Sequence, residues 1–439
     1  MTKIQWTGKI RLSGATSLVI ANMIGTGVFT SLGFQLLGLH DLPAVLALWI
    51  VGAVAALCGA LVYGELGAAM PRSGGEYHYL SKIYHPVVGY LSGWISITIG
   101  FAAPVALASM AFGNYTSRIL PVASPTVLAL AALALITVLH CTGLRIGIAF
   151  QNAVTLMKII LILVFVCCGL FLAKQSVASS FFPTPETLKD MISPAFAVSL
   201  IFVYYSYSGW NASAYVAGEM ESPQTRLPIS LWAGTAVVAF LYLLLNYTFL
   251  KTAPASELKG QLEVGYVSAH YIFGRLGGDI LSTMISILLV SSISSMVFVG
   301  PRITQVMGED MALFRFFARR NGKGTPMNAI VFQSAISLAL ILTSTFEKVL
   351  TYVGFTLNLF TSLAVFGIFI HRRKFRSMER PYKTWGYPVV PLVFISLMAW
   401  TQVYLLIQRP VQSLAGLGTV FLGLIFYGIN SAIKNSKKV

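Results

Sequence analysis

Long apolar segments recur from one end of this 439-residue chain to the other. Each is close to the ~20 residues that an α-helix needs to cross the hydrocarbon core of a bilayer, which is about 30 Å thick. Only 10% of the residues are charged, whereas soluble domains carry roughly 25%. The pattern predicts an all-α polytopic membrane protein with twelve spans, at about 15–38, 43–69, 87–114, 125–142, 151–173, 193–218, 229–250, 278–301, 326–345, 349–370, 388–408 and 412–432.

The connections between these spans are short. The longest polar ones cover about 174–192 and 251–277, so we expect residues 1–439 to form one transmembrane domain. The N-terminal segment is polar and basic ahead of the first span, which makes it similar to a signal peptide. However, the apolar stretch is too long and lacks a small-residue cleavage site. We therefore expect it to remain as a span.

Basic residues are unevenly distributed over the connections. The net charge is +16, and 21 of the 30 Lys and Arg residues fall on one side if both termini are cytoplasmic. An excess of Lys and Arg in short loops marks the cytoplasmic side of a membrane protein. The basicity therefore reflects topology, and we expect no nucleic-acid partner. We expect a multi-pass protein of the cell (cytoplasmic) membrane, embedded in the lipid bilayer with both termini in the cytoplasm.

Residues that support catalysis or metal binding are scattered. The four cysteines, Cys58, Cys141, Cys167 and Cys168, lie in or at the ends of apolar spans, and the six histidines show no metal-ligand spacing. No nucleophile with a base, and no pair of acids, gathers near one face. We expect neither enzymatic activity nor a metal or other cofactor.

Two of the spans are interrupted at matching positions. The first, in VIANMIGTGVFTSLGF, carries Gly25, Thr26 and Gly27 at its centre, and the sixth has the polar, aromatic stretch YSYSGWN at 205–211. Backbone at membrane depth is left unpaired only where protein or a water-filled cavity satisfies it. Corresponding interruptions in two halves of a chain point to a transporter binding site. Because the interrupted spans lie five apart, the second half must be inverted relative to the first.

Unwinding at residues 25–27 would expose N–H groups at the start of a half-helix, where the helix dipole favours an anion such as a carboxylate. Carbonyl groups released at the other half-helix end can accept hydrogen bonds from an ammonium group. An amino acid carries both groups. A Gly-x-Gly motif also permits close helix packing, and one such motif alone would favour packing. The matching interruption in the sixth span favours substrate binding.

Five motifs follow one another in the order and spacing of a known family. They are IGTGVF, YGELGAAMPRSGGEYHYL, YSGWNASAYVAGEMESPQTRLP, GPRITQVMGEDMALFRFFARRNGKGTP and RPYKTWGYPVVPL. In these stretches the chain resembles the amino acid–polyamine–organocation transporters, in particular the bacterial relatives of the L-type amino acid transporters. The resemblance implies alternating access in a five-plus-five inverted repeat, about 15–173 and 193–370. Two trailing helices follow at about 388–432.

The resemblance also implies how the site binds its substrate. The backbone of Thr26 and Gly27 would bind the carboxylate of an amino acid. Tyr205 stands where the family places a gating aromatic, often Phe or Trp, so the gate here would be more polar. The carbonyl groups of Met23, Tyr205 and Ser208 would bind the ammonium group, and Asn211 would line the sixth-span interruption. The full expected set is Met23, Ile24, Gly25, Thr26, Gly27, Tyr205, Ser208, Gly209 and Asn211.

Lys158 is the only basic residue well inside a span. An intramembrane charge is a functional hypothesis by default, although a lysine stem can also extend to the interface. The family resemblance implies that its ammonium group lies against the first-span interruption, in place of the sodium ion of related transporters. We therefore expect sodium-independent transport, with Lys158 titration as one route to proton coupling. Span eight offers a weaker alternative, since Ser291, Ser292, Ser294 and Ser295 carry hydroxyls that could bind sodium.

Acids are absent from the middle of the spans. Glu65 and Glu219 lie near the cytoplasmic ends of spans two and six, where interfacial placement explains both. A desolvated cation without an anionic partner is costly, so the sequence favours neutral amino acids as substrates, moved by exchange or by proton symport. Cationic amino acids, polyamines or other amines remain alternatives if Glu219 reaches the site. So does an amino-acid sensor of the same fold that does not transport.

The loop NYTSRILPVASP between spans three and four contains no cysteine. Animal members of the resembled family join a heavy subunit through a cysteine in this loop. We therefore expect a small-molecule substrate but no disulfide-linked partner.

Overall fold

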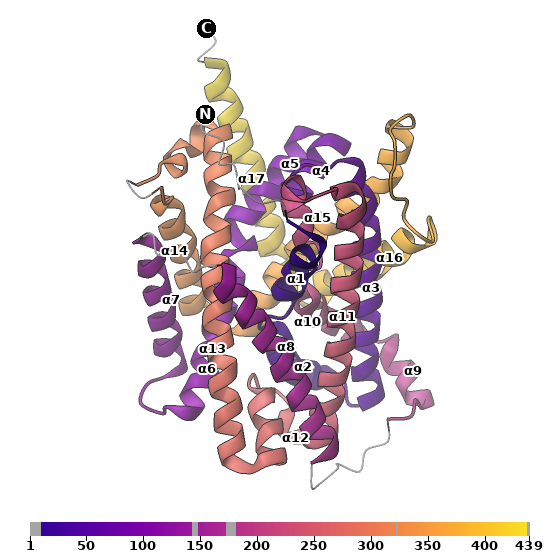
Figure 1. Cartoon of the computed structure of the whole chain (residues 1–439), viewed down its shortest axis with the longest axis vertical. Coiled ribbons are helices and arrows are strands. Elements are labelled where there is room, and N and C mark those ends of the chain that lie inside the picture. The colour runs from indigo at the N-terminus through magenta and orange to yellow at the C-terminus, as the bar shows by residue number, and fades with distance from the viewer. Residues whose placement is uncertain (1–9, 143–147, 173–180, 322–323, 437–439) are drawn as a thin grey trace.

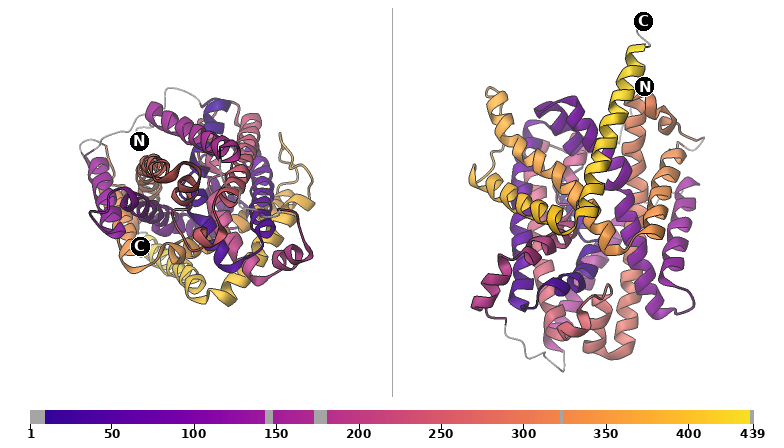
Figure 2. Two further views of the ribbon diagram at one scale, coloured as in Figure 1. Left: turned by 90° about the horizontal axis from the view of Figure 1, so that it is seen from below. Right: turned by 180° about the vertical axis from the view of Figure 1, so that it is seen from behind.

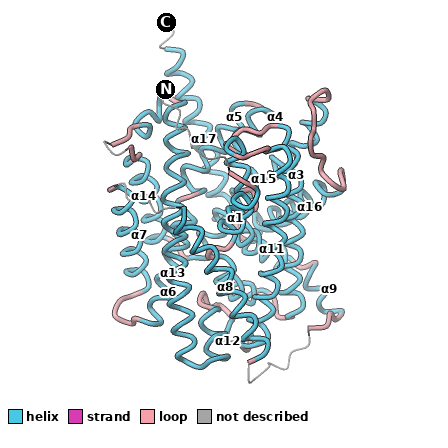
Figure 3. The backbone as a smooth tube through the Cα atoms, viewed as in Figure 1, coloured by secondary structure: helices cyan, strands magenta, loops and turns pink. Residues whose placement is uncertain are grey.

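The computed structural model describes residues 10–142, 148–172, 181–321 and 324–436. Within these ranges the chain is helical, and the one strand-like pairing is an isolated bridge between Ile10 and Met220. The helices form a single bundle with mostly short connections (Figures 1 and 3). Residues 1–9 and 437–439, on which the orientation argument partly depends, lie outside the described ranges.

In the described part of the chain, nine helical segments are long and apolar enough to cross a membrane. They are Leu12–Gly38, Leu42–Ala69, Pro86–Ile119, Ala153–Phe171, Pro223–Thr252, Val264–Glu309, Phe346–Lys374, Val389–Gln408 and Pro410–Ala432. The pair Pro185–Met191 and Pro194–Glu219 passes the same test only when its two parts are taken together, and these parts are bent by 68°. The apolar helices α7 (Pro125–Cys141) and α14 (Met327–Thr343) have only 17 residues each. A polytopic helical membrane protein is thus confirmed, and the count of twelve stays a prediction because α7 and α14 are short.

Both expected interruptions are present. The first span consists of α1 (Leu12–Met23) and α2 (Gly27–Gly38). The sixth consists of α10 (Pro194–Tyr207) and the 3₁₀ segment η2 (Ala212–Glu219). In each case the helix stops in the middle of an apolar stretch, at the residues where glycine and polar side chains replace the apolar run.

Two spans differ from their predicted form. The eighth was predicted at 278–301 but belongs to α13 (Val264–Asp310), which turns at Gly274, where φ is +74°. The stretch before Gly274 is a separate helix across this kink, so the predicted span corresponds to the helix that follows it. The third span contains a π-helical turn, η1 (Ser96–Gly100), between α5 (Pro86–Ile95) and α6 (Ala102–Ile119). No periodicity in the sequence signalled it.

Helices α2 and α10 are buried along nearly their whole length, inside the bundle that Figure 2 shows from below and from behind. Helix α11 (Pro223–Thr252) packs along α1 and along α3 (Leu42–Ala69), while α10 packs against α2, α3 and α15 (Phe346–Lys374). Helix α4 (Gly75–Ile83) and the last turns of α17 (Pro410–Ser436) lie at one end of the bundle, whereas α9 (Pro185–Met191) and α12 (Ala255–Leu258) lie at the other (Figure 1). We refer to the first as the α4 end.

The chain before α1 is paired with the chain after η2. The Ile10 N–H donates to the Glu219 carbonyl at 2.9 Å, and the Glu221 N–H donates to the Ile10 carbonyl at 3.0 Å. These two bonds connect the start of one interrupted span to the end of the other.

Candidate binding site at the two interruptions

The two interruptions pack directly against each other. The hydroxyls of Thr26 and Tyr205 lie 3.4 Å apart. A Cβ atom on Gly27 would lie 2.5 Å from Ser206 Oγ, so only glycine permits this approach of α2 to α10. The structure therefore brings the first and sixth spans together at the positions that the sequence singled out.

Gly25 and Gly209 differ in their surroundings. A Cβ atom on Gly25 would meet only the Met23 carbonyl oxygen, at 3.9 Å, so this glycine borders open space. Gly209 has φ of +98°, and its Cβ would lie 2.9 Å from the backbone of Asn22. Gly209 is therefore required by the backbone turn and by close packing, whereas Gly25 leaves room beside the start of α2.

The released carbonyl groups already accept hydrogen bonds from the protein. Tyr242 Oη, on α11, donates to the Met23 carbonyl at 2.6 Å. The N–H and hydroxyl of Ser208 both donate to the Tyr205 carbonyl, at 3.0 and 2.6 Å. A carbonyl oxygen has two lone pairs, so the Met23 carbonyl keeps one for a further donor. The role of Tyr242 was missed in the sequence, where it is one of several tyrosines in an apolar span.

Lys158 lies on α8 (Ile148–Phe171) with 3% of its surface exposed. Its ammonium group donates to the Ile24 carbonyl at 2.8 Å and to Ser292 Oγ on α13 at 3.3 Å. The side chain therefore does not extend to the interface. It lies between the first interruption and Ser292 of the eighth span, two features that the sequence pattern does not connect. No carboxylate among the described residues pairs with it.

Two acids were expected near the cytoplasmic ends of spans, Glu65 and Glu219. Both lie away from the interruptions. Glu65 is buried in an ion cluster: Arg372 donates to its two carboxylate oxygens at 2.9 and 2.6 Å, and the Thr384 N–H donates at 2.6 Å. The interfacial explanation of Glu65 is thus replaced by a buried structural cluster on α3. Glu219 is the last residue of η2.

The acid that contacts the sixth-span interruption is Glu76, a residue that no local sequence pattern marks as a site residue. Its Oε1 atom accepts hydrogen bonds from Tyr63 Oη at 2.7 Å, Asn211 Nδ2 at 3.0 Å and Thr361 Oγ1 at 3.3 Å. Burial raises the pKa of Glu76, against the opposing effect of these hydrogen bonds. What the sequence does show is the glycine pair before it: Gly74 and Gly75 have φ of +121° and +50°, which turn α4 back into the bundle.

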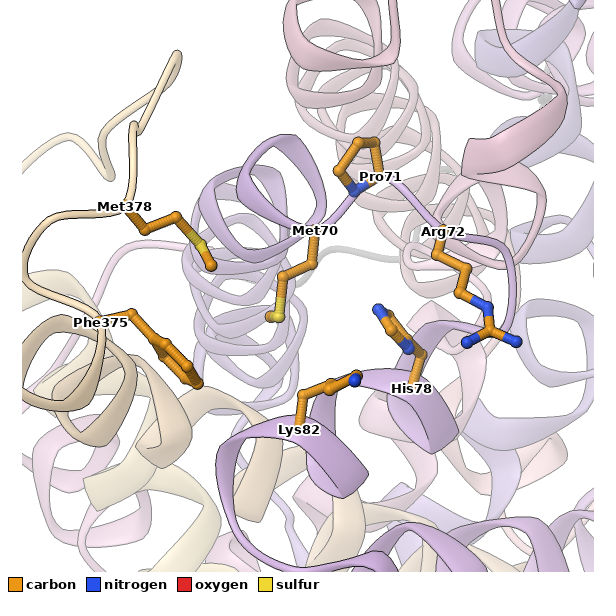
Figure 4. Close-up of a pocket in the computed structure, with 7 residues that line it drawn as sticks. All are labelled: Met70, Pro71, Arg72, His78, Lys82, Phe375 and Met378. Atoms are coloured by element: carbon orange, nitrogen blue, oxygen red, sulfur yellow. The ribbon is translucent and has the colours of Figure 1, made fainter.

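A surface pocket lies at the α4 end, away from the interruptions. It has a volume of about 380 Å³ and is lined by Met70, Pro71, Arg72, His78, Lys82, Phe375 and Met378 (Figure 4). Burial, with the nearby charges of Arg72 and Lys82, lowers the pKa of His78. His78 shares α4 with Glu76, so this helix separates the open pocket from the sixth-span interruption.

The described residues contain no group of three or more side chains that could hold a metal ion. The groups that meet at the two interruptions are backbone carbonyls, hydroxyls, the Lys158 ammonium group and the Glu76 carboxyl group.

Comparison with known proteins agrees with this geometry. The chain is 29% identical to the serine/threonine exchanger SteT of Bacillus subtilis (strain 168), over 88% of this chain and 89% of the relative. It is 26% identical to the human b(0,+)-type amino acid transporter 1, over 95% and 87%. It is 25% identical to the large neutral amino acids transporter small subunit 2 of Mus musculus, over 95% and 80%. The family model described as amino acid permease matches residues 10–428, and the chain therefore belongs to the amino acid permease family, whose members are transporters and not enzymes.

Proposed function

We propose that this protein exchanges neutral amino acids across the cell membrane by alternating access, independently of sodium. The observation that carries the proposal is the pairing of the two interruptions, with the hydroxyls of Thr26 and Tyr205 3.4 Å apart and open space beside Gly25. Names of relatives support the substrate class, since SteT is a serine/threonine exchanger and another relative is a large neutral amino acids transporter subunit.

The carboxylate of the substrate binds at the start of α2. The first N–H groups of a helix have no partner within it, and the helix dipole favours an anion there. Gly25 adds the space that a ligand needs, because no side chain fills the position beside it. Thr26 and Gly27 supply the backbone, and the Tyr205 ring closes over the ligand.

The ammonium group of the substrate binds the carbonyl oxygens near Met23, Tyr205 and Ser208, with Ile24, Gly209 and Asn211 completing the set. The Met23 carbonyl oxygen keeps a lone pair for an N–H donor of the substrate, whereas the Tyr205 carbonyl becomes available when Ser208 releases it. Lys158 occupies the position of a bound cation, because its ammonium group already bonds to the Ile24 carbonyl.

The fold follows the two repeats, about 15–173 and 193–370, with trailing helices at about 388–432. The α4 end is cytoplasmic, as the distribution of Lys and Arg predicts, and both termini lie there. No heavy subunit is attached by a disulfide, because the loop between α6 and α7 lacks a cysteine.

The test is uptake into sealed proteoliposomes preloaded with mixed amino acids. Radiolabelled alanine, serine, leucine and arginine are offered in turn, with and without sodium. Uptake of a neutral label that requires internal amino acid and not sodium is the expected result. Uptake of arginine alone would contradict the neutral substrate class and favour a cationic substrate paired with Glu76. Tight binding in detergent without uptake would make the protein a sensor.

A further inference from the structure

Glu76 is a buried acid that the exchange mechanism above does not use. It lies on α4 and is 6% exposed. Its three hydrogen-bond donors come from α3, from the sixth-span interruption and from α15, elements far apart in the sequence. Glu76 therefore sits where the helix covering the α4 end meets the wall of the proposed substrate site.

The groups that face Glu76 carry no positive charge. The titratable ones are Tyr63 on α3, Tyr79 on α4 and Tyr215 on η2. Phenols are neutral at physiological pH, and α15 contributes only a threonine hydroxyl. Across the described residues no Lys, Arg or His forms an ion pair with Glu76. A buried carboxylate without a cation is costly, so the neutral acid fits this site better.

The pattern of hydrogen bonds matches a protonated acid. All three donors converge on Oε1, and within the described part of the chain no hydrogen bond reaches Oε2. A protonated carboxyl group keeps one oxygen as an acceptor and carries its proton on the other. Glu65 provides the contrast within the same protein: both of its oxygens accept hydrogen bonds from Arg372.

We propose that Glu76 is a proton-binding site whose charge state controls the opening of the substrate site toward the cytoplasm. The proposal deepens the exchange function above and rests on it. With the proton bound, the neutral acid is stable in its buried site and α4 stays against the sixth-span interruption. Loss of the proton to cytoplasmic water leaves a carboxylate without a cation, and hydration of that charge separates α4 from the interruption.

The first experiment measures serine exchange in proteoliposomes between about pH 5 and 8, with the same pH on both sides. In the wild type the rate is expected to change by about fivefold or more across this range, as one titrating group would produce. The Glu76→Gln variant, which mimics the neutral acid, should vary by less than about twofold. Glu186→Gln is the matched control, because Glu186 is an exposed acid on α9 at the opposite end. A Glu76→Gln variant with the wild-type pH profile, or a wild type insensitive to pH, would overturn the proposal.

A second variant keeps the acid and changes its surroundings. Tyr63→Phe removes the shortest hydrogen bond to Oε1, which stabilises the carboxylate form. The midpoint of the pH profile should therefore move upward by roughly half a unit to one unit. A purely structural contribution of Tyr63 would lower the rate and leave the midpoint in place, and that result would count against the proton site. If Glu76→Gln fails to fold, this variant carries the test.

Thermal stability gives a measurement that needs no transport. Because the folded-state pKa of Glu76 lies above its value of 4.5 in an unfolded chain, the native state holds a proton that the unfolded state releases. Stability from Glu76 is thus complete below pH 4.5 and is lost as the pH rises through the folded-state pKa. Glu76→Gln should lack this loss. Equal pH curves for the two proteins would overturn the proton site, whereas different curves without any wild-type exchange would contradict the proposed function instead.

Discussion

The two interruptions face buried groups of opposite character. At the first, Lys158 and Tyr242 donate to the carbonyl groups that α1 releases. At the second, Glu76 accepts a hydrogen bond from the Asn211 side chain. Each buried ionisable group lacks an oppositely charged partner among the described residues. The difference is one of hydrogen-bonding role: groups that donate hold the first interruption, and a carboxyl group that accepts holds the second.

Removal of the donor at the first interruption should have the largest effect. Lys158→Ala leaves the Ile24 carbonyl and Ser292 without their ammonium partner, and a buried unpaired polar group costs about 1–3 kcal/mol. We expect amino-acid exchange to fall by about 100-fold or more, since the first interruption also binds substrate. Lys189→Ala, on the exposed helix α9, is the control in the same vesicle assay. Unchanged exchange at every pH between about 5 and 8 would remove Lys158 from the mechanism.

Gly25 tests whether the space at the first interruption belongs to the substrate. Gly25→Leu adds a side chain where a Cβ meets only the Met23 carbonyl, so the fold should survive while substrate affinity falls by about tenfold or more. Binding is measured by titration calorimetry in detergent, and folding by size-exclusion chromatography. Gly27→Leu is the comparison, because its side chain would collide with Ser206 and disturb packing as well. Normal affinity in Gly25→Leu would contradict the carboxylate site.

Gly209 should show the reverse behaviour at the second interruption. Its φ of +98° and the 2.9 Å approach to Asn22 leave no place for a side chain. Gly209→Ala is expected to destabilise the protein by about 1–3 kcal/mol, which a thermal-shift assay would register as a lower Tm. A Gly209→Ala variant as stable as the wild type would show that the turn relaxes, and would weaken the contrast with Gly25.

Tyr242 offers the smallest of these effects. Tyr242→Phe removes one neutral hydrogen bond to the Met23 carbonyl, worth about 1 kcal/mol or roughly fivefold in exchange rate. Its pH profile should match that of the wild type, because no titrating group is lost at the first interruption in this pH range. A shifted pH midpoint in this variant would mean that the two interruptions are not independent.

The sequence predicted the parts of the site that depend on local pattern. Glycine and polar residues inside an apolar run locate both interruptions. Lys158 is identified as a candidate because it is a lone charge inside a span. The role of Glu76 was not visible, because its burial depends on the turn at Gly74 and on partners such as Thr361 that lie far along the chain. The π-helical turn of the third span could not be predicted either, because the residues there follow the same pattern as those of an ordinary α-helix.

The pairing of Ile10 with Glu219 and Glu221 has a mechanical consequence. These two main-chain hydrogen bonds join the segment before α1 to the segment after η2, so a displacement of the leading segment acts on η2 as well as on α1. The half-spans α1 and η2 are therefore mechanically coupled at the α4 end and are expected to move together. A tag or fusion joined just ahead of Ile10 would load both half-spans at once, whereas the same tag behind α17 would load neither.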